Sequence, residues 1–546
     1  MKKINTVLLA AKNIKSMQMT SQLMTSIRGK PVILWCLNSL FEKGFVYVDV
    51  IINQHDIKLK SFLSKNVYFT HYHLNIIEVD DKAFQHFSIL DSLDVALQSV
   101  VPSLPTQIIL ADTMIYEPFP SISDVFYTSK NITASDRWCL IEKNEKNYVT
   151  KFFDKIADID VENKEALVGY YKLSNTALLQ TSVEKALEQK KRHLSDAFAL
   201  YDKYQPIQAI ITKSWIDFGH ISGIVDARFK LFNVRAFNRL SVDAVRGTIM
   251  KSSKDKQKIK DELHWFQSLP NDLKVLTPKI LNSKEDDAYF YMEMELLGYP
   301  SLSECFVYGE NSLEDWHYIL KKVFQLHRLL DERKAKNDKA ELEALYIHKT
   351  QKRLLEIEGS NTFKEIIHHR DIMINGRHFK NLLAMKDDIM QKCIELSRFD
   401  GDFSIVHGDY CFSNILFDSM YYVFRLIDPR GRFKSDTLYC DPRYDYAKLR
   451  HSFVGLYDYV VLGFYHFKQL SRRQFEYKIV TTKNRQQFAI YFNRLLSNTS
   501  LNAKEVESIE ALLFLTMLPL HKDDIQRQKV LYLIAIEKLN KVLYDD

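Results

Sequence analysis

Short apolar runs alternate with amphipathic helical patterns over the first 230 residues of the chain. This succession of strand, helix and strand predicts a mainly parallel sheet covered by helices on both faces. Ligands of such sheets bind at the carboxyl ends of the strands, so polar residues at those ends are the first candidates for a site. The expected strands cover 6–11, 47–52, 74–79, 107–110 and 138–142, and the expected helices include 31–41 and 88–99.

The pattern changes near residue 230. Short β-type runs and one charged helix come first, and helical patterns then dominate from residue 313 to the C-terminus. This order predicts a small β-rich lobe followed by a larger helical lobe. The expected elements are strands at 235–239, 245–251 and 289–297, a helix at 254–269 that Pro270 ends, and a strand-rich stretch at 404–428.

The length of the chain agrees with this division. At 546 residues it is too long for one hydrophobic core. We predict an α/β fold in two parts. A Rossmann-like parallel-sheet domain covers 1–228 and a two-lobed α+β domain covers 229–546, with its small lobe at 229–300 and its helical lobe at 301–546.

Charge, cysteine placement and hydropathy exclude several classes of function. The net charge of +6 is spread along the chain, which suits phosphorylated metabolites and predicts no nucleic-acid binding. None of the six cysteines forms a C-x-x-C pair, so neither a zinc site nor a disulfide framework is expected. No stretch approaches the roughly 20 apolar residues of a membrane span. Lys12 interrupts the first apolar run, which predicts a cytoplasmic protein without a signal peptide. The oligomeric state stays open.

The strongest candidate for chemistry lies at 405–431. Phosphoryl transfer needs a carboxylate to orient the attacking hydroxyl and oxygen ligands for Mg²⁺. Asp409 follows an apolar strand in a tight loop, where its carboxylate can act as a base. Asn414 begins the next apolar strand and Asp428 ends the one after it, so both can offer oxygen to a metal.

This pattern resembles the aminoglycoside phosphotransferase and choline kinase family, whose signature is H-G-D-x-x-x-x-N followed by I-D. The resemblance implies that Asp409 is the catalytic base, that Asn414 and Asp428 hold Mg²⁺, and that ATP or another nucleoside triphosphate is the donor. The matched positions are His407, Gly408, Asp409, Asn414, Ile427 and Asp428.

The same resemblance implies residues for the phosphates and the nucleobase. Lys251 ends a β-type run and would neutralise phosphate charge, and Glu262 on the following helix would hold its ammonium. Met294 would begin the segment that faces the adenine. Asp445, in a stretch that looks like the family's D-P-x-x-D-x-A element, would brace the catalytic loop.

The N-terminal domain resembles the sugar-nucleotidyltransferase family. Leu8-Leu9-Ala10-Ala11 with Met17 keeps the frame of the family's triphosphate loop, and Gly29-Lys30-Pro31 keeps the next element. Asp112 and Asp217 each follow an apolar run and look like the two metal-binding segments, since two converging carboxylates can hold one Mg²⁺.

The first loop departs from that family. Lys12, Ile14 and Ser16 stand where the family has glycines and arginine, and Gln22 stands near the expected lysine. Side chains there impede the close approach of backbone N–H groups to phosphates. The resemblance therefore implies the fold and a nucleotide such as CTP, while nucleotidyl transfer and a substrate-binding role both stay open.

Two functions follow. The first is a phosphotransferase that acts on a hydroxyl of a small metabolite, such as an amino alcohol, a polyol or a sugar. Its N-terminal domain would make or recognise a nucleotide-activated product, as the resemblance implies for bacterial surface-polysaccharide pathways. The alternative is a glycosyltransferase-like enzyme whose kinase-like half binds nucleotide as a regulator. Acidic and aromatic residues beside the catalytic loop could cage a cationic acceptor or serve as structural braces, and these are Asp436, Asp441, Tyr444 and Asp445.

Overall fold

The computed structural model describes most of the chain in two compact units, residues 1–231 and 232–546. The described residues are 3–11, 22–27, 30–65, 73–80, 87–130, 135–212, 214–219, 239–243, 245–308, 311–418, 421–433, 438–481 and 484–545. Within these ranges no helix is both long enough and apolar enough to cross a membrane.

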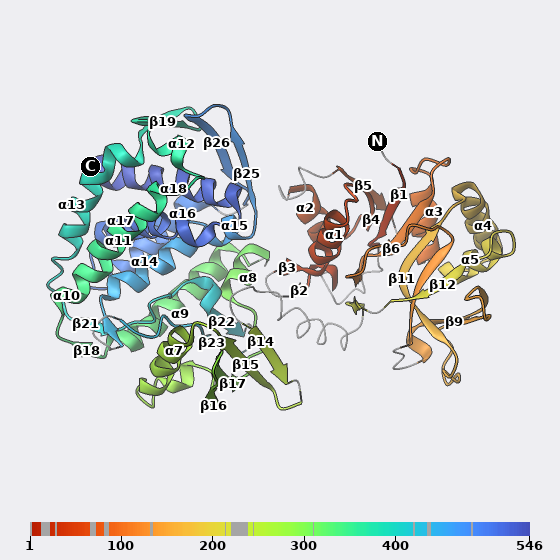
Figure 1. Ribbon diagram of the computed structural model, residues 1–546, viewed down its shortest axis with the longest axis horizontal. Helices are drawn as coiled ribbons and strands as arrows, with labels where there is room; N and C mark the ends of the chain where they lie inside the picture. The colour runs from red at the N-terminus through yellow and green to blue at the C-terminus, as the bar shows by residue number, and fades with distance from the viewer. Residues whose placement is uncertain are drawn as a thin grey trace. The chain divides into compact units, whose positions relative to one another are not determined.

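A nine-stranded mixed sheet forms the centre of the first unit (Figure 1). Its strands are β1 (Asn5–Leu9), β4 (Tyr47–Asn53), β5 (His73–Val79), β6 (Thr106–Leu110), β8 (Val125–Ser129), β9 (Cys139–Lys143), β10 (Val149–Asp154), β11 (Glu165–Leu173) and β12 (Gln208–Ile211). The order is β10-β9-β11-β6-β1-β4-β5, with β8 paired to β11 and β12. The strands β6, β1, β4 and β5 are parallel, whereas β11, β9 and β10 extend the sheet in antiparallel fashion.

Helices cover both faces of this sheet. They are α1 (Val32–Glu42), α2 (Ile57–Lys65), α3 (Ile89–Leu97), α4 (Thr176–Glu188) and α5 (Leu194–Asp202). Successive side chains of a strand point to opposite faces, so Leu8 packs with α1 and α2 while Val7 and Leu9 pack with α3, α4 and α5. Two short antiparallel pairs complete the unit, β2 (Ser26–Ile27) with β3 (Lys30–Pro31), and β7 (Thr113–Ile115) with the distant β13 (Trp215–Asp217).

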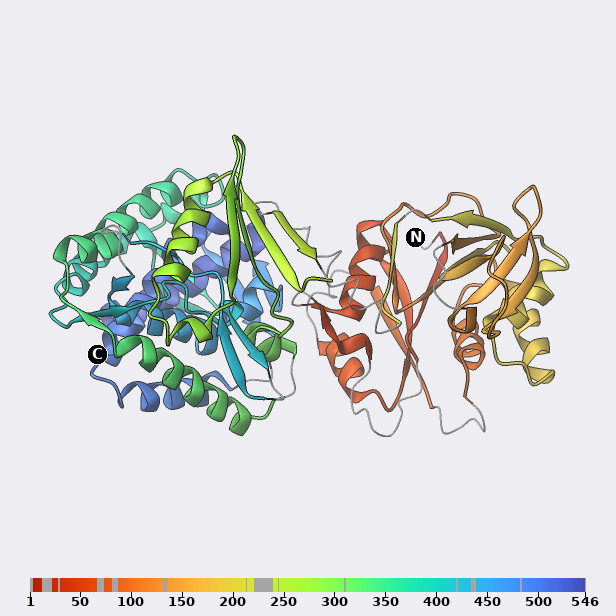
Figure 2. The ribbon, with the colours of Figure 1, turned by 90° about the horizontal axis from the view of Figure 1, so that it is seen from below.

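The second unit begins with a small lobe made of an antiparallel sheet and one long helix. The sheet has the order β14-β15-β17-β16, and Figure 2 shows α7 lying beside it. Asp255 caps the start of α7, and Pro270 follows its last turn, where proline cannot continue a helix. The elements are β14 (Arg239–Asp243), β15 (Thr248–Ser253), α7 (Lys256–Ser268), η6 (Lys274–Leu276), β16 (Ile280–Glu285) and β17 (Phe290–Glu295).

The rest of the second unit is mainly helical. Its helices and helical turns are α8 (Leu302–Tyr308), α9 (Leu313–Asp331), α10 (Lys339–Leu342), η7 (Glu343–His348), α11 (Lys349–Glu358), α12 (Lys364–Ile367), η8 (Leu382–Met385), α13 (Lys386–Leu396), η9 (Phe412–Asn414), α14 (Pro442–Phe453), α15 (Tyr457–Val461), α16 (Arg485–Leu496), α17 (Ala503–Thr516), η10 (Leu518–His521) and α18 (Ile525–Tyr544). A buried ionic network joins three of them, because Glu510 of α17 pairs with Arg450 of α14 and with Lys538 of α18. Glu507 of α17 also pairs with Arg450, at 3.0 Å, so two carboxylates offset the two cations of the network.

Three small sheets lie within the helical lobe. Their strands are β18 (Lys334–Ala335), β19 (Asp371–Ile374), β20 (Arg377–Lys380), β21 (Phe403–Ile405), β22 (Ile415–Asp418), β23 (Val423–Leu426), β24 (Tyr439–Cys440), β25 (Tyr465–Gln469) and β26 (Gln474–Ile479). The expectation that strands beyond residue 313 occur only at 404–428 was wrong, because β20-β19-β26-β25 form a separate four-stranded sheet. These strands have four to six residues with frequent charges, so they lack the apolar run that predicts a strand.

The predicted fold class is confirmed. A parallel-strand α/β unit is followed by a unit with a small antiparallel lobe and a larger helical lobe. Element boundaries differ from the expected ones by a few residues, as they do for β1 and α7.

Candidate active site

A buried carboxylate holds the loop that carries Asp409. Asp445 of α14 accepts hydrogen bonds from the backbone N–H groups of His407, at 2.7 Å, and Gly408, at 2.8 Å. Gly408 has a φ of +75°, and a Cβ there would lie 2.6 Å from the nearest side-chain atom, so the turn needs glycine. On its other side, Asp445 contacts Nε2 of the buried His327 at 3.1 Å. Asp445 therefore braces the loop and is not available to a ligand.

His407 ties this loop to the strand that precedes Asp428. Its Nε2 lies 3.0 Å from the carbonyl oxygen of Ile427, and its Nδ1 accepts from the backbone N–H of Asp409 at 3.3 Å. A carbonyl only accepts and an N–H only donates, so the neutral imidazole with its proton on Nε2 satisfies both contacts. Burial lowers the pKa of His407, which keeps it neutral.

Asp409 is held from two sides and stays partly exposed. Its Oδ1 lies 2.8 Å from Nζ of Lys448, and its Oδ2 accepts from Nδ2 of Asn414 at 3.0 Å. Burial alone would raise its pKa, but Lys448, His407 and Asn414 outweigh burial and lower it. The side chain is 40% exposed. An ionised, oriented carboxylate that a hydroxyl can reach is what a general base requires.

Asn414 is oriented by its own hydrogen bonds. Its Nδ2 donates to the backbone carbonyl and to the carboxylate of Asp409, both at 3.0 Å. Its Oδ1 therefore points away from Asp409, where it accepts from Oγ of Ser413 at 3.2 Å. An amide oxygen in this orientation is a suitable ligand for Mg²⁺.

Asp428 and Lys251 form an ion pair across 177 residues of sequence, with 2.8 Å between Oδ1 and Nζ. Lys251 also bonds to Oε2 of Glu262 at 2.5 Å. Lys251 and Glu262 are 7% and 3% exposed, whereas Asp428 is 51% exposed. Burial would lower the pKa of Lys251, but the two carboxylates outweigh burial and raise it, so the ammonium stays charged.

The backbone around Asp428 brings the two lobes close together. Asp428 itself has a φ of +54°, a left-handed conformation that aspartate tolerates better than most residues. Gly431 has a φ of +92°, and a Cβ there would lie 2.3 Å from the carbonyl carbon of Asp261. Nε1 of Trp265, one turn further along α7, donates to the carbonyl of Val406 at 2.9 Å. The helix that carries Glu262 is thus packed directly on the segments around Asp428 and Asp409.

Five of the six site residues expected in this unit make contacts with one another, in two groups. Asp409 contacts Asn414, and Lys251 contacts both Glu262 and Asp428. Met294 lies apart from these two groups of contacts. It is in β17, opposite Ile249 of β15, and is 8% exposed. In the described part of the chain its side chain makes no hydrogen bond to Lys251, Glu262 or Asp428. A role beside the nucleobase stays a prediction.

Sequence reasoning missed Lys448, which contacts Asp409, and Lys349, which contacts Tyr444. Lys448 and Tyr444 lie one turn apart on α14, and Nζ of Lys349 at the start of α11 donates to the Tyr444 hydroxyl at 2.7 Å. The backbone N–H of Arg430 donates to the carbonyl of His407 at 2.9 Å. The only sequence signal for Lys448 is its place three residues after Asp445.

The idea of an acidic cage for a cation does not fit the structure. The Asp441 carboxylate binds the guanidinium of Arg443, at 2.6 Å from Nη2, and accepts from the Tyr346 hydroxyl at 2.7 Å. Asp445 accepts from two backbone N–H groups of the loop that carries Asp409, and both carboxylates are 0% exposed. Asp436 lies outside the described residues. Asp441 and Asp445 are therefore structural braces.

In the first unit, Asp112 and Asp217 converge around Gly219. Asp112 follows β6, and Asp217 ends β13, which pairs with β7. A Cβ on Gly219 would lie 2.8 Å from Oδ2 of Asp112 and 3.0 Å from Oδ1 of Asp217, so both carboxylates border one point. The backbone N–H of Phe218 donates to the Asp112 carbonyl at 2.7 Å and fixes this approach.

These two carboxylates suit a divalent cation. Asp112 lies in the turn between β6 and β7, and Asp217 ends β13, where its Oδ1 accepts from the backbone N–H of Gly219 at 2.8 Å. Two carboxylates that border one point can together supply oxygen ligands to Mg²⁺. Among the described residues, no group of three or more His, Cys, Asp and Glu side chains is arranged to hold a metal, so each candidate site offers a pair of ligands. Lys12, Ile14, Ser16, Met17 and Gly29 of the first loop lie outside the described residues, as does the side chain of Gln22.

Several solved structures of sugar-nucleotide enzymes align with the N-terminal part of the chain. A protein from Bacillus anthracis, described as a glucose-1-phosphate thymidylyltransferase, is 11% identical over 42% of this chain and 96% of that chain, with a TM-score of 0.37. A UDP-glucose pyrophosphorylase from Acinetobacter baumanii is 13% identical over 43% and 95% of the two chains, with a TM-score of 0.34. HddC from Yersinia pseudotuberculosis is 17% identical over 42% and 99%, with a TM-score of 0.33. No protein-family model and no curated protein matches the chain.

Proposed function

We propose that the second unit is a phosphotransferase that moves the γ-phosphoryl group of a nucleoside triphosphate to a hydroxyl of a small metabolite. The observation that carries this proposal is the pairing of two sets of contacts. An ionised Asp409 is oriented by Asn414 and Lys448, and Lys251 is clamped between Glu262 and Asp428. The first set supplies a base, and the second supplies a fixed cation for phosphates.

The chain's own residues account for the steps of this reaction. Asp409 accepts the proton of the attacking hydroxyl, the hydroxyl oxygen forms a bond to the γ-phosphorus, and the bond to the β-phosphate oxygen breaks to release the diphosphate. Lys251 stabilises phosphate charge, and Glu262 keeps its ammonium in place. Asn414 and Asp428 would hold Mg²⁺, which offsets the charge of the triphosphate when bound.

For the first unit we infer a nucleotide site at Asp112 and Asp217. Two carboxylates that border one point could hold the Mg²⁺ of a triphosphate such as CTP. The site would then activate or recognise the phosphorylated product of the second unit, and this order of reactions agrees with a nucleotide-activated precursor of a surface polysaccharide. The intact set of Asp409, Asn414 and Asp428 favours a working phosphotransferase over the alternative in which this half only binds nucleotide.

A nucleotide-consumption screen of the full-length protein tests both assignments. ATP, GTP and CTP with Mg²⁺ are supplied with a panel of alcohols, and diphosphate nucleotide and pyrophosphate are measured separately. Diphosphate release that depends on an acceptor supports the phosphotransferase, and pyrophosphate formation supports nucleotidyl transfer by the first unit. Nucleotide binding without either product would favour the glycosyltransferase-like alternative.

A further inference from the structure

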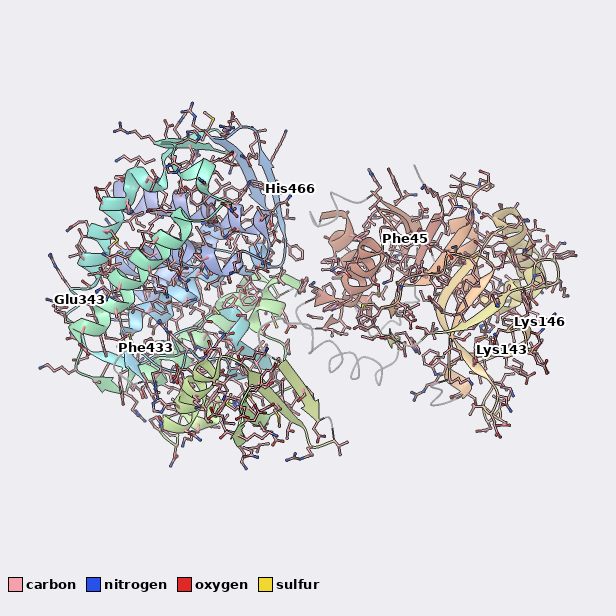
Figure 3. All side chains as sticks on the ribbon, viewed as in Figure 1. Phe45, Lys143, Lys146, Glu343, Phe433 and His466 are labelled. Atoms are coloured by element: carbon pink, nitrogen blue, oxygen red, sulfur yellow. The ribbon has the colours of Figure 1, made fainter. Side chains whose placement is uncertain are left out.

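Three basic side chains from different segments lie around Tyr444 and Asp409: Lys448 of α14, Lys349 of α11 and Arg430 of the segment after Asp428. Lys448 contacts Asp409 at 2.8 Å, and Tyr444, one turn earlier, accepts from Lys349 at 2.7 Å. Side chains four residues apart on a helix lie on the same face, with Cβ atoms roughly 5–6 Å apart. Arg430 comes from the segment after Asp428, and its guanidinium lies 5.1 Å from the ring centre of Phe433, which Figure 3 labels.

Among the described residues, Lys448 is the one basic side chain of this group that contacts a carboxylate. Lys448 has Asp409 as its partner, but Lys349 is hydrogen-bonded to a neutral hydroxyl and stacks over the same Tyr444 ring at 4.9 Å. Among the described residues, neither Lys349 nor Arg430 has a carboxylate within ion-pair distance. The nearest acidic residues on α14, Asp441 and Asp445, are fully buried and engaged elsewhere.

The electrostatic state of Tyr444 agrees with this imbalance. Burial alone would raise the pKa of its hydroxyl, but Lys349, Lys448 and Arg430 together outweigh burial and lower it. Burial also lowers the pKa of Lys349, because a partly buried ammonium has lost water and gained no counter-ion. Both effects indicate a positive potential beside the base that a bound anion would neutralise.

We infer that the acceptor of this phosphotransferase carries an acidic group, a carboxylate or a phosphate, which Lys349 and Arg430 bind while the acceptor hydroxyl faces Asp409. The inference rests on the proposed function and restricts its acceptor to alcohols that carry an acidic group. Cationic acceptors such as amino alcohols would be repelled.

Acceptors matched in size test this inference. The full-length protein with Mg²⁺ and ATP is given two series of acceptors. The first contains neutral glycerol, cationic ethanolamine and the acidic glycerate and glycerol 3-phosphate. The second contains neutral glucose and the acidic glucuronate and glucose 6-phosphate. We expect an acidic member to show a kcat/KM at least roughly 10-fold above its neutral counterpart, because hydrogen bonds to charged groups contribute this much or more. The carboxylate and phosphate arms identify which acid is used. The inference fails if glycerol, glucose or ethanolamine is the best substrate, and phosphotransfer itself is then still established.

Lys349→Met separates acid recognition from catalysis. We expect it to raise KM for the acidic acceptor roughly 10- to 100-fold, with little change for the neutral one. Lys352→Met, an exposed lysine of the same helix, is the matched control and should change neither value. An equal loss for acidic and neutral acceptors in Lys349→Met would contradict a role in binding the acid.

If no acceptor gives diphosphate, the proposed function fails. A binding measurement still tests the acidic-acceptor inference in that case. Calorimetric titration of glycerate and glycerol 3-phosphate into the protein without nucleotide should show binding that Lys349→Met abolishes and Lys352→Met keeps. Absence of binding, or binding that Lys349→Met leaves unchanged, would overturn the acidic-acceptor inference.

Discussion

Lys251 of the small lobe and Asp428 of the helical lobe form an ion pair with 2.8 Å between Nζ and Oδ1. The pair connects the strand that would neutralise phosphate charge to the carboxylate that would hold Mg²⁺. Because Lys251 also bonds to Glu262, one ammonium fixes two carboxylates from distant parts of the sequence. Substitutions at each end therefore test function and stability separately.

Asp409→Asn tests the catalytic base. Asparagine keeps the size of the side chain but cannot accept the hydroxyl proton, so we expect acceptor-dependent diphosphate release to fall by roughly 10²- to 10⁴-fold. The affinity for Mg²⁺-nucleotide should change little. The thermal unfolding temperature should fall, because Lys448 is 16% exposed and loses its counter-ion. Turnover at the wild-type rate would remove Asp409 from the mechanism.

Lys251→Met tests the ammonium between the lobes. It leaves Glu262, which is 3% exposed, without its cation, and we expect a loss of about 3 kcal/mol in the free energy of unfolding. The double variant Lys251→Met, Glu262→Gln should recover most of that stability, measured by chemical denaturation, and should stay inactive. Recovered activity in the double variant would show that Lys251 has only a structural role.

Gly431→Ala tests the close packing of the Asp428 segment on α7. A Cβ at this position would lie 2.3 Å from the backbone of Asp261, so α7 and the segment must move apart. Gly376→Ala is the control, because Gly376 also has a positive φ but has open space around its Cβ. The control should cost only the conformational penalty, about 1–2 kcal/mol. Gly431→Ala should lower the unfolding temperature further and abolish diphosphate release, and equal effects of the two variants would contradict the packing argument.

His327→Gln tests the buried ionic support of the catalytic loop. Burial would lower the pKa of His327, but Asp331 and Asp445 outweigh it and raise the pKa from 6.5 to about 9. A raised pKa in the folded state contributes stability that is fully present below pH 6.5 and is lost as the pH rises through 9. We expect His327→Gln to cost roughly 2–3 kcal/mol more at pH 6 than at pH 9.5, measured by denaturant unfolding. A cost independent of pH would mean that His327 is neutral in the folded protein.

Asp112→Asn and Asp217→Asn test the first unit. If the two carboxylates hold the metal of a triphosphate, each variant should abolish pyrophosphate formation and leave diphosphate release by the second unit unchanged. Gly219→Ala should act in the same way, because its Cβ would push against both carboxylates. Asp136→Asn, at an exposed position of the same unit, is the control. Pyrophosphate formation that survives all three site variants would place nucleotidyl transfer elsewhere.

The local residues of the site could be read from the sequence, and the distant ones could not. Asp409, Asn414 and Asp428 stand at fixed spacings around strands β22 and β23, so their chemistry and context are visible together. Lys251 and Glu262 were found through a family resemblance. Lys349 and Lys448 carry no such signal, because they reach the site only when α11 and α14 pack in the folded lobe. The sheet of β19, β20, β25 and β26 was missed for a related reason. Its strands are short, and its two local pairs, β19 with β20 and β25 with β26, join across about 100 residues, where Met373 pairs with Gln474.

The contacts of α7 have a consequence for its mobility within the second unit. Trp265 is 0% exposed and bonded to Val406, the backbone of Asp261 packs against Gly431, and Glu262 is bonded to Lys251. To swing outward, the helix would have to break all three contacts at once and expose an indole. Because these contacts would have to be lost together, we expect α7 to keep its position, and the Lys251–Glu262 pair to stay formed, whether or not a nucleotide is bound.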